Sequence, residues 1–175
     1  MTTLAPQLTT LLPKLWRFAL RLTRHHDDAQ DLVQRTCVRA LERQHQWHPE
    51  GSALSWLYAI LHSIWLNETR SRRLHPVASL SADDDDAPAP DVVDDCAADP
   101  QALLFFRQVV GAVDALPEAQ RIVMLLVAVE GLSYREAADV LGVPVGTVMS
   151  RLSRARAVIG ERFATSRTKG KVHVA

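Results

Sequence analysis

The chain has 175 residues, 47% of them hydrophobic, and its 20 Lys/Arg and 20 Asp/Glu residues give a formal net charge of zero. This hydrophobic share is enough for packed cores, but no apolar run approaches the roughly 20 residues that span a bilayer, and the start lacks the pattern of a signal peptide. The two cysteines, Cys37 and Cys96, lack CxxC spacing and favour neither a disulfide framework nor a zinc site, so we expect a cytoplasmic protein without membrane insertion.

The charges are strongly segregated along the chain. Residues 1–73 carry ten Lys/Arg against six Asp/Glu (net +4), and residues 74–100 carry none against eight (−8). Residues 101–150 carry three against five (−2), and residues 151–175 carry seven against one (+6). Basic ends around an acidic middle indicate separate roles for the segments, with nucleic acid at the basic ends.

The N-terminal segment has the apolar spacing of three helices. A broad apolar stripe predicts a helix over about 9–23, and apolar residues three and four apart predict a second helix over about 27–44. Ser52 is placed to cap a third, long helix that ends near Arg73. We therefore predict an N-terminal helical domain over residues 1–73.

Residues 74–100 form the predicted linker. Asp, Ala and Pro dominate this stretch, and without periodicity it cannot bury enough apolar surface to order itself. A second domain is expected over residues 101–164, followed by a disordered basic tail over 165–175. Strand signals are absent, since Val and Ile fall at helical spacing. The predicted fold class is all-α, with two small helical domains joined by a flexible acidic linker.

The second domain is expected to begin with two helices and to end in a helix-turn-helix. Asp99 and Pro100 are placed as the cap and first residue of a helix that runs to about Leu116. A second helix is predicted over 117–130. The stretch 131–156, GLSYREAADVLGVPVGTVMSRLSRAR, then has the pattern of a helix-turn-helix.

Caps and turn residues support the helix-turn-helix. Ser133 and Glu136 form a capping box at the start of its first helix. Gly142 is placed to end that helix in a left-handed conformation, and Val143 and Pro144 form the turn before a second helix.

The second helix of this motif has one apolar and one basic side. Its inward positions are Val148, Leu152, Ala155 and Ile159, and its solvent positions are Thr147, Ser150, Arg151 and Arg154. A positively charged second helix packed on a short first one is the geometry that enters a DNA major groove. The alternative is an ordinary helical hairpin with a solvated basic face.

These features resemble a known family. The C-terminal half, with LPEAQRIVMLLVAVE before the helix-turn-helix, resembles region 4 of bacterial sigma factors of the extracytoplasmic-function (ECF) type. The N-terminal half is similar to their region 2 in DDAQDLVQRTCVRAL (27–41) and SWLYAILHSIWLNETRSRR (55–73). The resemblance covers about 11–73 and 101–163, and two motif blocks in the right order are more specific than either alone.

The resemblance implies a polymerase-binding surface on the second helix. In the family, region 2 binds the clamp helices of the RNA polymerase β′ subunit, and the matching residues here are Asp28, Asp31, Leu32, Gln34 and Arg35. All but Leu32 point away from the apolar stripe by helical geometry, and Leu32 sits at its edge, where it serves either core or partner. Arg35 stands where the family has an acidic residue. The alternative is a solvated polar face.

The resemblance also implies that region 2 melts and captures the −10 promoter element. The candidate residues are Trp47, His48, Ser63, Asn67, Arg70, Arg72 and Arg73. In the family, the loop over 45–52 receives an extruded base, on which Trp47 would stack; equally, Trp47 closes the core. The arginines suit phosphate contacts. Asparagine and aspartate are usual where Ser63 and Asn67 stand. Trp56 is expected in the core, and the alternative is that it acts as a wedge in the DNA.

Region 4 in the family reads the −35 promoter element. Its candidate residues here are Tyr134, Arg135, Thr147, Ser150, Arg151 and Arg154. Arg151 and Arg154 are the best candidates for guanine edges or phosphates. Lysine is often present where Met149 stands.

The partners implied by the resemblance are core RNA polymerase (β′ clamp helices and β flap), promoter DNA and an anti-sigma factor. The resemblance also implies that the acidic linker threads toward the active-site cleft; the alternative is a plain solvated tether. We expect no enzymatic activity, cofactor, metal or small-molecule substrate, because no catalytic or metal-binding constellation is present. Two other interpretations remain: a stand-alone helix-turn-helix regulator that binds duplex DNA without polymerase, and a protein-interaction adaptor.

Overall fold

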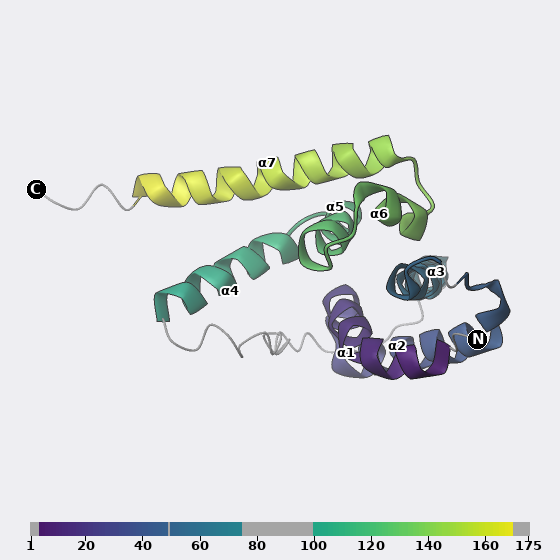
Figure 1. Cartoon of the computed structure of the whole chain (residues 1–175). Coiled ribbons are helices and arrows are strands. Elements are labelled where there is room, and N and C mark those ends of the chain that lie inside the picture. The colour runs from purple at the N-terminus through teal and green to yellow at the C-terminus, as the bar shows by residue number, and fades with distance from the viewer. Residues whose placement is uncertain (1–3, 49, 75–99, 170–175) are drawn as a thin grey trace, which may run out of the picture. The chain divides into compact units, whose positions relative to one another are not determined.

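The computed structural model describes residues 4–48, 50–74 and 100–169, of which Arg73 and residues 165–169 are described in backbone only. Every regular element in these ranges is helical (Figure 1), which confirms the predicted all-α fold class. The described residues pack as two units, the first built around α1 to α3 and the second around α4, α5 and α7. No helix in these ranges is long and apolar enough to cross a membrane.

The first unit is a three-helix arrangement. Its elements are α1 (Leu4–Thr23), α2 (His26–Glu42), the short 3₁₀ turn η1 (Gln44–Gln46) and α3 (Ala53–Leu74). All three helices contact one another. The largest fully buried side chains of its core are Leu4, Leu15, Phe18, Leu22, Leu32, Leu57, Tyr58 and Leu61.

The N-terminal ends of α3 and α1 can be compared with the predicted ones. The Ser52 hydroxyl accepts a hydrogen bond from the Ser55 N–H at 3.2 Å, which confirms the predicted cap of α3. Helix α1 begins at Leu4, earlier than predicted, because buried Leu4 and Leu8 extend its apolar stripe by one turn. Pro6 in this first turn does not oppose the helix, because the N–H that it lacks has no partner there anyway.

The C-terminal described range, 100–169, contains α4 (Pro100–Asp114), α5 (Glu118–Met124), the π-helical turn η2 (Leu125–Val129), α6 (Tyr134–Leu141) and α7 (Val145–Lys169). Helices α5 and α4 both contact α7, and the rings of Phe105 and Phe163 lie 5.6 Å apart between α4 and α7. The core of the second unit includes Val113, Ile122, Val123, Leu125, Leu126, Ala137, Val148, Leu152 and Ala155.

One predicted helix of the C-terminal range contains a wider turn, and one predicted boundary differs from the structure. The helix expected over 117–130 is present as α5 followed directly by η2, whose wider turn lets the Glu130 N–H bond to the Leu125 carbonyl at 2.9 Å. The tail expected to be disordered from residue 165 is helical through Lys169. A helix already anchored by packing propagates at little cost, and no glycine or proline interrupts 165–169.

Candidate nucleic-acid interface

The start of α6 is fixed by a reciprocal cap. The Glu136 N–H donates to the Ser133 hydroxyl at 3.2 Å, and the Ser133 N–H donates to the Glu136 carboxylate at 2.9 Å. The Ser133 hydroxyl itself also donates to that carboxylate at 2.7 Å. These bonds satisfy backbone donors that have no partner within a helix, and they confirm the predicted capping box.

A left-handed glycine then sets the turn between α6 and α7. Gly142 has φ = +63°, as predicted, and the Val143 N–H returns to the Ala138 carbonyl at 3.1 Å. The Pro144 carbonyl accepts the Thr147 N–H at 2.8 Å, which starts α7 at Val145. The turn therefore determines where the second helix of the motif begins.

Replacing Gly142 by alanine should lower the free energy of unfolding by about 1 kcal/mol, because an L-residue with a Cβ is strained at positive φ. No atom lies within 4 Å of the added Cβ, so the loss would come from the backbone alone. Gly160→Ala is the control: this exposed glycine lies within α7, where alanine should raise stability by up to about 1 kcal/mol. Thermal unfolding followed by circular dichroism should show opposite shifts; equal shifts would contradict the account.

The outer side of α7 carries the candidate −35 residues. Arg154 and Ser150 are exposed, while Arg151 and Thr147 are half-buried. On the other side of the helix, Val148, Leu152 and Ala155 are at most 1% exposed. The Ser150 hydroxyl donates to the Thr147 carbonyl at 3.0 Å, a bond that it must give up to donate to a phosphate. Tyr134 and Arg135 on α6 are exposed.

Four of the five candidate polymerase-binding residues on α2 are accessible, and the fifth is buried. Asp31, Gln34 and Arg35 are exposed and Asp28 is half-buried. Leu32 is only 1% exposed, so it packs in the core and offers no surface to a partner. The partner role considered for Leu32 is therefore not supported.

Ion pairs tie this surface of α2 to α3. Arg35 pairs with Asp31 at 3.1 Å and also with Glu68 of α3, and its pKa is raised, chiefly by the hydrogen bond to Asp31. Arg72, near the end of α3, pairs with Asp28 at 3.5 Å. Two residues predicted for different ligands, Arg72 for DNA and Asp28 for polymerase, thus neutralise each other in the free protein.

The candidate −10 residues differ from one another in how far their side chains are exposed. His48, Ser63, Asn67 and Arg70 are exposed. The side chain of Arg73 lies outside the described residues. Trp47 is 8% exposed, and its indole N–H has no hydrogen-bond partner. Of the two interpretations of Trp47, burial supports the core role over stacking on a base.

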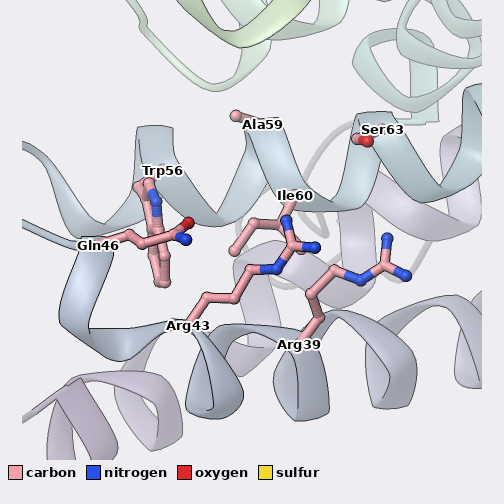
Figure 2. A pocket seen from close by; sticks show the side chains of 7 residues that line it. All are labelled: Arg39, Arg43, Gln46, Trp56, Ala59, Ile60 and Ser63. Carbon is pink, nitrogen blue, oxygen red and sulfur yellow. The ribbon is translucent and has the colours of Figure 1, made fainter.

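A pocket between α2 and α3 contains residues that the sequence analysis did not assign to DNA (Figure 2). It has a volume of about 200 Å³ and is lined by Arg39, Arg43, Gln46, Trp56, Ala59, Ile60 and Ser63. Of these, only Ser63 was predicted as a site residue. The pocket could not be found from apolar spacing, because Trp56 fits the core stripe of α3 while it is half-buried in the folded unit.

Two family models match the chain. The model of sigma-70 region 2 matches residues 8–75, and the model of sigma-70 region 4 matches residues 106–159. The first match spans the three helices of the first unit, and the second spans the helix-turn-helix.

Individual relatives agree with these models. The ECF RNA polymerase sigma factor EcfG of Rhodopseudomonas palustris is 33% identical over 153 residues, which cover 87% of this chain and 81% of that protein. ECF sigma factor SigE of Mycolicibacterium smegmatis is 34% identical over 155 residues, which cover 86% and 58%. The sigma factor RpoE from Bartonella quintana, solved in complex with the anti-sigma factor NepR, is 27% identical with a TM-score of 0.67 over 90% of this chain and 94% of that one.

A helix-turn-helix with arginines on the outer side of its second helix defines a DNA-binding class of protein. The relatives narrow this class. The chain belongs to the family of ECF RNA polymerase sigma factors, and the predicted resemblance is confirmed.

Proposed function

We propose that this sigma factor brings core RNA polymerase to particular promoters, docks on the −35 element through α7, and captures the −10 element through α3. The observation that carries the proposal is the position of Arg151 and Arg154 on the outer side of α7, whose opposite side is buried. Such arginines can bond to guanine edges in the major groove or to phosphates. The exposed polar end of α3 supplies the second contact.

Polymerase would bind the outer side of α2. Asp31, Gln34 and Arg35 are exposed there, and Asp28 becomes available once its pair with Arg72 opens. In this proposal the β′ clamp helices compete with the internal ion pairs. Such exposed pairs are worth only about 0–1 kcal/mol, so they oppose binding weakly.

An anti-sigma factor is the proposed regulator. RpoE from Bartonella quintana forms a complex with NepR, and CnrH, 25% identical to this chain with a TM-score of 0.61, forms one with the cytosolic domain of CnrY. These complexes support the same mode of control here. The proposed site of action is the cytoplasm, and the bond-making chemistry belongs to the polymerase rather than to this chain.

The polymerase surface is tested by reversing one exposed charge. Asp31→Lys should weaken binding of the full chain to core polymerase about tenfold or more, because a like charge would then face the partner residue that Asp31 attracts. Fluorescence anisotropy of the labelled chain measures this affinity. Glu42→Lys, an equal change at the far end of α2, is the control and should bind normally.

Two results would contradict the proposal. Unchanged affinity of the Asp31→Lys variant would remove this face of α2 from the polymerase surface. Tight, sequence-specific binding of the wild-type chain to duplex DNA without polymerase would favour a stand-alone regulator.

A further inference from the structure

Two ion pairs connect α2 with α3, and their polarities are opposite. At the start of α2, the Asp28 carboxylate lies 3.5 Å from the Arg72 guanidinium of α3. About two turns later on α2, Arg35 pairs with Glu68 of α3, so the two helices run antiparallel here. The Asp28–Arg72 pair therefore joins the start of α2, which carries candidate polymerase-binding residues, to the end of α3, which carries candidate −10 residues.

The Asp28–Arg72 pair is the weaker of the two. Arg35 is held by two carboxylates, that of Asp31 at 3.1 Å and that of Glu68, whose side chain is 21% exposed. The side chains of Asp28 and Arg72 are 40% and 59% exposed, and neither has a second ion-pair partner among the described residues. Water and salt screen a pair that is this exposed, so a competing ligand can open it at little cost.

Each member of this pair belongs to a different candidate binding surface. Asp28 lies about one turn before exposed Asp31 on α2, and Arg72 follows exposed Asn67 and Arg70 on α3. While the pair is closed, the guanidinium offsets the negative charge that a cationic group of polymerase would meet. The carboxylate likewise offsets the positive charge that a phosphate of DNA would meet. Polymerase and DNA must therefore break the same ion pair, and whichever binds first removes that cost for the other.

We propose that the Asp28–Arg72 pair is an autoinhibitory contact that couples the polymerase-binding and DNA-binding surfaces of the first unit. A −10 strand that binds Arg72 frees Asp28 for polymerase, and polymerase that binds Asp28 frees Arg72 for the strand. The inference rests on the proposed function and deepens it, because it assigns a regulation to the same sites. Linkage requires the two effects to be equal, and the strength of an exposed ion pair sets each at about two- to fivefold.

Removing Arg72 should strengthen polymerase binding in the absence of DNA. In Arg72→Gln, Asp28 no longer has to leave a partner, so the full chain should bind core polymerase about two- to fivefold more tightly than the wild type. Fluorescence anisotropy of the labelled chain measures this affinity. Arg17→Gln removes the same charge from an exposed position on α1 and should bind as the wild type does. An Arg72→Gln variant that binds no more tightly than Arg17→Gln would overturn the inference.

A double-mutant cycle separates the ion pair from direct repulsion between Arg72 and a cationic group of polymerase. Asp28→Asn removes the partner of Arg72, so adding Arg72→Gln to Asp28→Asn should leave the polymerase affinity unchanged. Direct repulsion would act whether or not residue 28 carries a charge. A gain from Arg72→Gln that persists in the Asp28→Asn protein would therefore contradict the autoinhibitory role of the pair.

A single-stranded oligonucleotide of the non-template −10 region tests the coupling itself. The measured quantity is the factor by which saturating oligonucleotide tightens binding of the full chain to core polymerase. This factor should be about two- to fivefold larger for the wild type than for Arg72→Gln or Asp28→Asn, which have no pair to open. Arg70→Gln is the matched control: it removes a neighbouring exposed arginine but no ion pair between described residues, and it should keep the wild-type factor. Equal factors in all four proteins would exclude the coupling.

The inference and the proposed function fail in different ways. If the wild type binds core polymerase but the Arg72→Gln and Arg17→Gln variants bind alike, the autoinhibitory contact is wrong and the sigma factor role is unaffected. If the wild-type chain does not bind core polymerase, the proposed function fails, and the coupling fails with it.

Discussion

Changing Arg151 and Arg154 together to alanine should reduce promoter-specific initiation about 100-fold or more. Each good side-chain contact to a base is worth roughly 1–3 kcal/mol, and two such contacts combine to this magnitude or beyond. The fold should survive, because both side chains lie on the outer side of α7 and the packing residues Val148, Leu152 and Ala155 are untouched.

Initiation is measured as the yield of one transcript from a duplex promoter with saturating core polymerase. The matched control is Arg107→Ala with Arg156→Ala, which removes two exposed arginines from other positions in the same unit. The control should keep nearly full yield. If both double variants lost activity equally, general charge rather than specific contact by Arg151 and Arg154 would explain the effect.

Replacing Phe18 by alanine should destabilise the first unit by about 3–5 kcal/mol, because it leaves a cavity in the core. Phe18 is 0% exposed, and its ring lies 4.7 Å from that of Tyr58, which is also fully buried. Domains of this size are stable by only about 5–15 kcal/mol, so a large part of the stability would be lost. Recruitment of polymerase should fall with the stability of the first unit at physiological temperature.

Chemical denaturation of the full chain, followed by tryptophan fluorescence, measures this change, since all four tryptophans lie in the first unit. Leu12→Ala on the same helix is the comparison. Leu12 is 37% exposed, and its loss should cost well under half as much. A small effect of Phe18→Ala would mean that α1 does not pack on α3 as described.

The helix-turn-helix could be predicted closely because its signals are local. A capping serine, a glycine that adopts positive φ and a proline turn each act within a few residues, and the structure places all of them as expected. The first turn of α1, the widened turn η2 and the last turns of α7 were missed. Those features depend on packing against other helices or on propagation from them, which local residue preferences do not report.

The site could be predicted only in part. The exposed side of α2 follows from helical geometry, since Ala29 and Ala40 are fully buried and Asp31 and Gln34 are exposed. The roles of Leu32, Trp47 and Trp56 could not be separated in that way. Each is apolar and fits a core stripe, and only the fold shows that the first two are buried while Trp56 borders a pocket.

The most direct test of the central claim is run-off transcription with purified bacterial core polymerase, sheared DNA from the source genome and this protein, followed by mapping of transcript starts. We expect discrete starts that require the protein and that share two upstream sequence elements at constant spacing. Transcript starts that are the same with and without the protein would contradict the claim that this chain directs promoter choice.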